Sequence, residues 1–184
     1  MPAKGGDFER SFARALSLWW THGESDSVFW RVNASGGRAR VRAKTNRRTD
    51  NQYGDICAVE ASGHPLMAKT VWELKRGYGK WSPFDELDRS GRMKDQPFLM
   101  FWKQLMQAVE DSGNPNTHPF MVWRRDQRAA CIAMQTRTGL FIRNHVKGQG
   151  NPPPVHAFLL TSTVKVVLMP LAVFFEWCPP EVFK

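Results

Sequence analysis

The sequence is poor in cysteine, in acidic residues and in long apolar runs, and each shortage argues against a class of protein. Its 3 cysteines are widely spaced without a C-x-x-C pair, so neither a disulfide framework nor a zinc site is indicated. The 5 histidines show no metal-ligand spacing either. The longest apolar stretch, residues 166–175, is too short to span a bilayer and contains Pro170. Because the start also lacks an apolar leader, we expect a cytoplasmic protein with no membrane partner.

Acidic residues are outnumbered by basic ones, which favours a polyanionic partner. The chain has 26 Lys and Arg against 17 Asp and Glu, a formal net charge of +9. Nucleic acid and an anionic membrane would both suit this charge. With 184 residues and 42% hydrophobic content, the chain can bury one hydrophobic core and is too short for two comfortable domains. We therefore expect residues 1–184 to form a single domain.

Hydrophobic periodicity predicts two helices, in residues 5–20 with Asp7 as N-cap, and in residues 97–113 from Pro97 to a stop at Gly113. Short apolar runs bounded by turn residues predict strands at residues 28–32, 120–125, 128–134, 139–144, 157–162 and 165–169. Residues 170–177 suit either a short helix or a strand. The order of helices and strands predicts an α/β fold with a central mixed sheet flanked by helices.

The stretch "YGDICAVEASGHPLMAKTVWELKRG" reads as two strands joined by a turn at Gly63 and Pro65. An antiparallel hairpin that pivots about His64 would place Asp55 opposite Glu73. Opposed side chains on one sheet face have Cβ atoms roughly 4.5 to 5.5 Å apart, and like charges placed so are destabilising. Something must therefore compensate for this pair of carboxylates.

Lys75 supplies part of that compensation, since Glu73 and Lys75 share one face of the strand while Leu74 points into the core. Two carboxylates at such a separation also form a site for a hard divalent cation such as Mg²⁺, with water completing the coordination. The alternative is a solvated Glu73–Lys75 pair, with Asp55 merely ending a strand. The aromatic and β-branched strand, together with the opposed aspartate, favours the metal site.

These residues resemble the PD-(D/E)xK superfamily of restriction-endonuclease-like nucleases. Gly54-Asp55 precedes Glu73-Leu74-Lys75, and an earlier helix carries Glu9. Gly54 stands where the family has a proline. The layout is most similar to archaeal-type Holliday junction resolvases and to small phage or prophage nucleases, over about the first 125 residues.

The resemblance implies a central mixed sheet flanked by helices, DNA cleavage that depends on Mg²⁺ or Mn²⁺, and often a homodimer. It further implies that Asp55, Glu73 and the backbone carbonyl of Leu74 bind the metal. Lys75 would assist catalysis, and Glu9 would be an auxiliary ligand. From the sequence itself, Glu9 suits a surface ion pair with Arg10 or Arg14 equally well.

A cationic stretch beside these residues is suited to DNA phosphates. From residue 38 to residue 44 its basic residues alternate with small apolar ones, so that an extended chain would present one cationic face. They are Arg38, Arg40, Arg42, Lys44, Arg47 and Arg48, and Ser35 in the preceding loop is a further candidate for phosphate contact. The alternative is a charged edge strand that resists aggregation. Arg124, Arg125 and Arg128 form a second, smaller basic cluster.

The interpretation that these features favour is a metal-dependent DNA endonuclease acting on branched DNA in recombination or repair. A non-catalytic DNA-binding protein is the rival from another class, in which the acidic pair and lysine serve structure. A sequence-specific restriction endonuclease differs from the leading interpretation only in its target.

Overall fold

The computed structural model describes residues 4–32, 53–77, 97–146, 157–160 and 165–184. Its elements follow in the order α1 (Lys4–Trp20), β1 (Phe29–Arg31), β2 (Ile56–Ala58), the 3-10 helix η1 (Ala61–Gly63), α3 (His64–Lys69), β3 (Thr70–Arg76), α4 (Pro97–Asp111), β4 (His118–Arg124), β5 (Cys131–Gln135), α5 (Thr136–His145), β6 (Ala157–Leu160), β7 (Lys165–Pro170), α6 (Leu171–Trp177) and the 3-10 helix η3 (Pro180–Phe183).

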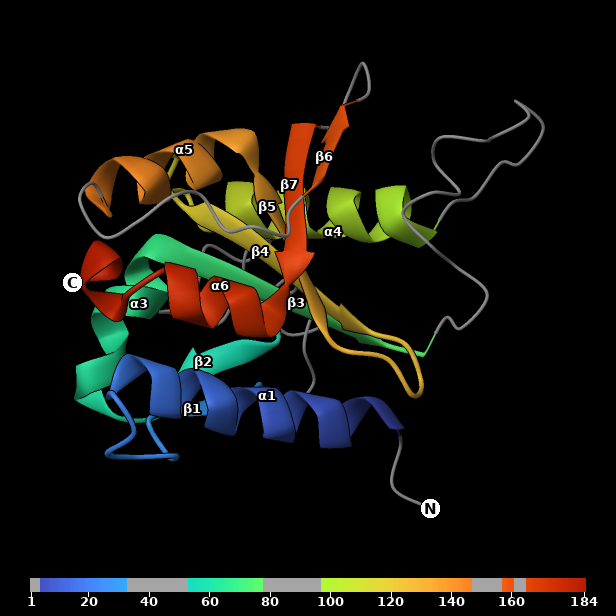
Figure 1. The fold of residues 1–184 in the computed structure, drawn as a ribbon. Coiled ribbons are helices and arrows are strands. Elements are labelled where there is room, and N and C mark those ends of the chain that lie inside the picture. Colours follow the sequence, from blue (N-terminus) through green and yellow to red (C-terminus); the bar gives the residue numbers. More distant parts are fainter. Residues whose placement is uncertain (1–3, 33–52, 78–96, 147–156, 161–164) are drawn as a thin grey trace.

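Five strands form a mixed sheet in the order β3-β4-β5-β7-β6, which places β3 at one edge (Figure 1). β3 and β4 are parallel, and the remaining neighbours in this sheet are antiparallel. β1 and β2 form a separate two-stranded antiparallel sheet. Helices cover both faces of the larger sheet, so the predicted α/β fold with a central mixed sheet is confirmed.

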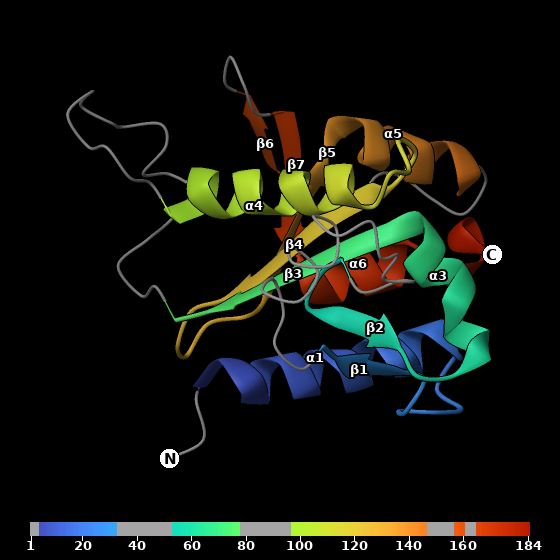
Figure 2. The same ribbon diagram turned by 180° about the vertical axis from the view of Figure 1, so that it is seen from behind.

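Alternation along the strands assigns each side chain to one of two cores. Trp72 and Leu74 of β3 face the core formed with α1, α5 and α6. Val71, on the opposite face of β3, packs with the apolar side of α4. Figures 1 and 2 show the sheet between these layers, with α6 on one side and α4 on the other.

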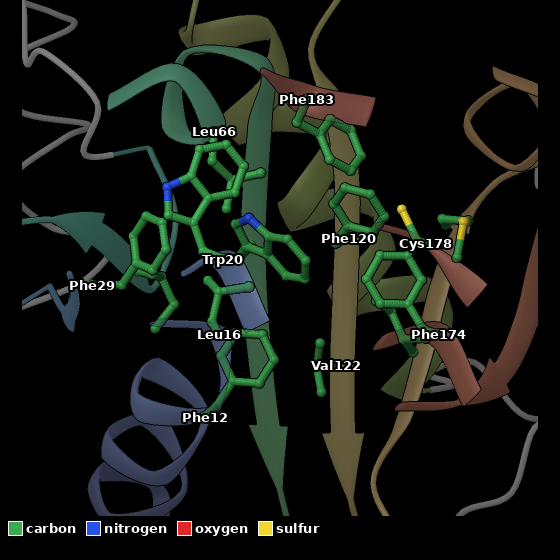
Figure 3. Close-up of a cluster of buried hydrophobic side chains, with 14 of the residues drawn as sticks. Phe12, Leu16, Trp20, Phe29, Leu66, Phe120, Val122, Phe174, Cys178 and Phe183 are labelled. Atoms are coloured by element: carbon green, nitrogen blue, oxygen red, sulfur yellow. The ribbon is translucent and has the colours of Figure 1, made fainter. Parts of the chain in front are cut away.

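The larger core is strongly aromatic, as the high Trp and Phe content suggests. Trp72 stacks on Phe120 of the neighbouring strand with ring centroids 4.4 Å apart. Phe12 from α1 and Phe174 from α6 close around the sheet, with Phe29 from β1 beyond (Figure 3). This packing attaches the small β1–β2 sheet and α1 to the face of the larger sheet, next to its β3 edge.

Both predicted helices are present as α1 and α4, and residues 171–177 form a helix. Asp7 is not an N-cap, since α1 already begins at Lys4. The strand predicted at residues 139–144 is wrong, because this segment lies in α5. Thr138, Ile142 and Val146 are buried at helical spacing there. Among the described residues, no helix is long and apolar enough to cross a membrane.

Candidate active site

β3 carries Glu73 and Lys75 at the edge of the large sheet. Both side chains lie on the face covered by α4, while Leu74 between them is buried in the opposite core. The Lys75 ammonium donates a hydrogen bond to Glu73 Oε1 and lies 4.8 Å from the ring centroid of Phe101 in α4. The Lys75 side chain is 20% exposed and the Glu73 side chain is 14% exposed. The strand thus presents an ion pair that is largely removed from water but still accessible.

Asp55 reaches this strand by a route that differs from the predicted hairpin. β2 pairs with β1, and η1 and α3 carry the chain on to β3. The hairpin and its register are therefore wrong, because residues 61–69 are helical instead of a tight turn. Asp55 nevertheless lies against β3, where its backbone N–H donates to Trp72 O at 2.7 Å. Its Oδ2 accepts a 2.7 Å hydrogen bond from the Leu74 N–H.

Gly54 makes this approach sterically feasible. A Cβ atom at position 54 would lie 2.3 Å from Trp72 O and 3.0 Å from Trp72 N. No side chain fits at that separation, so the residue before Asp55 has to be glycine for the backbone to approach β3 this closely. Glycine, in place of the proline found in the PD-(D/E)xK superfamily, therefore has a local steric reason at position 54.

The backbone of β3 offers an oxygen atom on the same edge. N–H and C=O groups of alternate residues point to the same side of a strand. Trp72 O and Leu74 N both bond to Asp55, whereas Gly77 N, at an odd position, donates to Arg124 O of β4. The Leu74 carbonyl consequently points to the Asp55 side of the strand. This geometry groups two carboxylates and one carbonyl at the edge of β3.

Glu9 of α1 approaches the same cluster. Its Oε2 lies 3.5 Å from Arg31 Nη1, and Arg10 and Arg14 pair instead with Asp7 and Asp26. Neither surface pair suggested by the sequence is formed. Burial, followed by the charge of Asp55, raises the pKa of Glu9, while Arg31 and Lys75 act to lower it. The helix thus places a third carboxylate near the edge of β3.

In the part of the chain that the structure describes, this cluster holds more carboxylates than cations. Burial is the largest cause that raises the pKa of Glu73, and the charge of Asp55 adds to it, although Lys75 opposes both. Among the described residues, three carboxylates therefore share two cations, Lys75 and Arg31. Such an arrangement is relieved by protonation or by a bound cation.

The donor set suits a hard divalent cation. Mg²⁺ is usually held by one or two carboxylates and keeps several waters. Asp55, Glu73 and the Leu74 carbonyl match that pattern, with Glu9 within electrostatic reach. In the described part of the chain, no three His, Cys, Asp or Glu side chains are arranged as a complete metal cage. The carbonyl and water would therefore have to complete the coordination.

The structure adds residues that the sequence did not single out. Arg31 lies beside Glu9 and is so close to α1 that a Cβ on Gly6 would be 2.8 Å from its Nη1. Phe101 lies under the Lys75 ammonium. No sequence signal links these residues to the motif, because each contact depends on how α1 and α4 pack. The predicted contact residues Ser35, Arg38, Arg40, Arg42, Lys44, Arg47 and Arg48 lie outside the described residues.

Comparison with known protein families identifies a match over nearly the whole chain. The model of a family described as "Phage putative PDDEXK endonuclease" matches residues 2–180, nearly the whole chain. No curated protein and no solved structure matches the chain.

Proposed function

The chain belongs to the phage putative PDDEXK endonuclease family, and we propose that it hydrolyses DNA phosphodiester bonds with a divalent cation held at the edge of β3. Nucleases of the PD-(D/E)xK type generally use divalent metal ions. We assign the ligands as Asp55, Glu73 and the Leu74 carbonyl, with Glu9 as an auxiliary ligand. The observation that carries this proposal is the pair of hydrogen bonds between Asp55 and β3, which fixes one carboxylate beside Glu73 and Lys75.

Each residue has a distinct part in the proposed reaction. When bound, a divalent cation stabilises charge on the phosphoryl oxygens and makes water more acidic. The Leu74 N–H holds the Asp55 carboxylate in one orientation, so this ligand needs little reorganisation. Lys75, held between Glu73 and the ring of Phe101, stabilises negative charge on the phosphate and orients the attacking water.

The finer points of the proposal are the ion, the target and the assembly. We propose Mg²⁺ or Mn²⁺ as the ion, because the donors are all oxygen atoms. Branched DNA is the proposed target and a homodimer the proposed assembly, both supported by the resemblance to archaeal-type resolvases. A single nuclease domain is supported by the family match over residues 2–180.

Cleavage of supercoiled plasmid and of a synthetic four-way junction tests this proposal. We expect cutting with Mg²⁺ or Mn²⁺ and none with EDTA. Glu73→Gln should reduce cutting by about 100-fold or more, with DNA binding retained, because a ligand is lost while the shape of the site is kept. Glu110→Gln is the matched control, since Glu110 is an exposed carboxylate on α4.

The products separate the alternatives. Paired nicks confined to the junction would identify a resolvase, and discrete plasmid fragments a sequence-specific enzyme. Binding without cleavage of any DNA would favour the non-catalytic protein. If Glu73→Gln cuts as well as the unmodified chain, the assignment of the site is wrong.

A further inference from the structure

The turn between β4 and β5 lies beside the carboxyl end of β3. β3 and β4 are parallel, with Lys75 opposite Trp123 and Arg76 opposite Arg124. β4 ends at Arg124 and β5 begins at Cys131, so the connecting turn starts next to the last residue of β3. Figures 1 and 2 both show this turn projecting past the sheet on the side where β3 ends. The turn is therefore close to the proposed active site.

Arginine dominates this turn. Arg124 and Arg128 are exposed and Arg125 is half-buried, whereas Asp126 is the acidic residue among them. Asp126 Oδ1 lies 3.8 Å from Arg76 Nε at the end of β3. Four arginines and one aspartate thus give this surface a formal charge of +3. We call these five residues the arginine turn.

The backbone holds the arginine turn in a defined shape. Arg124 Nε donates to Arg128 O at 3.3 Å, and Arg128 N donates to Arg125 O at 3.2 Å. Gln127 adopts a positive φ of 58°, which is typical of a tight turn. In the described part of the chain, the guanidinium groups of Arg125 and Arg128 have no hydrogen-bond or ion-pair partner. The turn thus fixes the backbone that carries these two cations, and no described residue neutralises them.

Protection against aggregation does not explain the charges. Proteins place charged residues on edge strands to prevent pairing with other chains. β4 and β5 are inner strands of the sheet, each hydrogen-bonded to a neighbour on both sides. Edge protection therefore does not account for these arginines, and a planar guanidinium is well suited to a phosphate group.

We propose that the arginine turn is a second DNA contact, which binds the duplex backbone about three base pairs from the cleaved bond. This inference rests on the proposed function. Arg76 and its neighbour Arg124 are three residue steps beyond Glu73 along the parallel strands, or roughly 10 Å at ~3.3 Å per residue. That length corresponds to about three base-pair steps of ~3.4 Å along the axis of a duplex that lies parallel to β3.

DNA binding measured against salt concentration tests the proposal. Fluorescence anisotropy with a labelled duplex, in Ca²⁺ or EDTA, would compare the full chain with the double variant Arg125→Gln/Arg128→Gln. Each lost phosphate contact lowers the slope of log K against log salt by about 0.9, so we expect a decrease of about two. At low salt the double variant should also bind the duplex more weakly than the unmodified chain, by about tenfold or more, because phosphate contacts are lost.

Arg143→Gln is the matched control, because Arg143 is an exposed arginine on α5. Its slope should match that of the unmodified chain. A double variant with the same slope as this control would overturn the proposal. If the double variant is unfolded by circular dichroism, the single variants Arg125→Gln and Arg128→Gln replace it. Each should lower the slope by about one, and single variants with the slope of the Arg143→Gln control would overturn the proposal.

Substrate length adds a test of position. Duplexes truncated to fewer than about three base pairs on one side of the cut should bind the unmodified chain less well and leave the double variant unaffected. Equal sensitivity in both proteins would contradict the proposed placement. If the unmodified chain binds DNA without cutting it, the proposed function fails, whereas the arginine turn is still judged by these binding curves.

Discussion

Asp55 and Glu73 carry the same charge but are held in different ways. Asp55 is 6% exposed and has a backbone hydrogen-bond donor, Leu74 N–H, directed at its carboxylate. Glu73 depends on the Lys75 side chain, and burial together with Asp55 raises its pKa. Asp55 is therefore the fixed element of the site. Burial makes the charge of Glu73 costly when no cation is present.

Glu73→Gln should increase stability in the absence of metal. Because the pKa of Glu73 is raised on folding, the folded chain holds its proton more tightly than the unfolded chain. The contribution of Glu73 to the free energy of unfolding is therefore fully present below the ordinary glutamate pKa. It is lost as the pH rises through the raised pKa of the folded chain. The variant lacks that loss, so in EDTA at neutral pH its melting temperature should be higher, by roughly 2–4 °C per kcal/mol gained.

Thermal unfolding from pH 4 to pH 8 measures this difference. The two proteins should converge at the acidic end and separate as pH rises. Glu110→Gln, which removes an exposed carboxylate, should follow the unmodified chain throughout. A variant less stable than the unmodified chain at neutral pH would mean that the hydrogen bond from Lys75 outweighs the cost of burying Glu73.

Gly54→Ala should disrupt both the fold and the site. The added methyl group would lie 2.3 Å from Trp72 O, so the backbone must move and the bonds of Asp55 to β3 must lengthen. Overpacking of this kind costs about 1–3 kcal/mol. We expect a lower melting temperature by calorimetry, together with loss of DNA cleavage. Val59→Ala, an exposed change in the same segment, should alter neither; equal effects of both changes would remove the steric argument.

At the scale of elements, the sequence predicts what depends on long periodic patterns. α1 and α4 were expected because their apolar residues repeat over several turns. The predicted hairpin failed because Gly63 and Pro65, read locally, indicate a turn. Gly63 instead packs tightly, where a Cβ would meet the ring of Phe29 at 2.7 Å, and Pro65 lies in the first turn of α3. Only tertiary packing distinguishes these alternatives.

The candidate site shows the same division. Glu73 and Lys75 could be named from the E-x-K strand, which is a local pattern, whereas Asp55 was placed by a hairpin that does not form and Glu9 by the resemblance to the nuclease family. The route that brings Asp55 to β3 could not be predicted, since it depends on contacts between strands of two different sheets. Those residue assignments remain predictions, to be tested by the substitutions described above.

The junction of β4 and α5 should make stability sensitive to mild acid. His118 stacks on Phe141 of α5, and its Nδ1 lies 3.1 Å from Thr138 Oγ1. Burial lowers the pKa of His118 to about 4, and the nearby charges of Arg137, Lys69 and His145 add to the effect. Because the unfolded chain takes up this proton more readily, stability falls as pH decreases from about 6.5 towards 4.

His118→Gln should flatten that dependence, since glutamine keeps a polar group near Thr138 but does not titrate. Chemical denaturation at pH 4.5, 5.5 and 7 would measure the slope. His64→Gln, which changes an exposed histidine, should leave the slope as it is. An unchanged slope in His118→Gln would show that another group is responsible for the sensitivity to acid.

At the scale of the whole molecule, the site is a joint between two sheets. The backbone of Asp55 accepts a hydrogen bond from Val32 N, just after β1, and donates one to Trp72 O in β3. α1, which carries Glu9, packs against both β1 and β3. The three carboxylates of the site therefore lie where the small sheet and α1 meet the edge of the large sheet. A cation bound there would stabilise this contact as well as the site.

A divalent cation should consequently raise the melting temperature of the entire chain. A ligand that binds only the folded state stabilises it by about 2.7 kcal/mol at 100 times its dissociation constant. For a chain of this size, that corresponds to roughly 5–10 °C. Calorimetry with increasing Mg²⁺, Mn²⁺ or Ca²⁺ should show this shift in the unmodified chain and in Glu110→Gln. The shift should be largely absent in Glu73→Gln, since the variant lacks a proposed ligand. Equal shifts in all three proteins would place the stabilising ion elsewhere, and the proposal that the edge of β3 holds the cation would then be wrong.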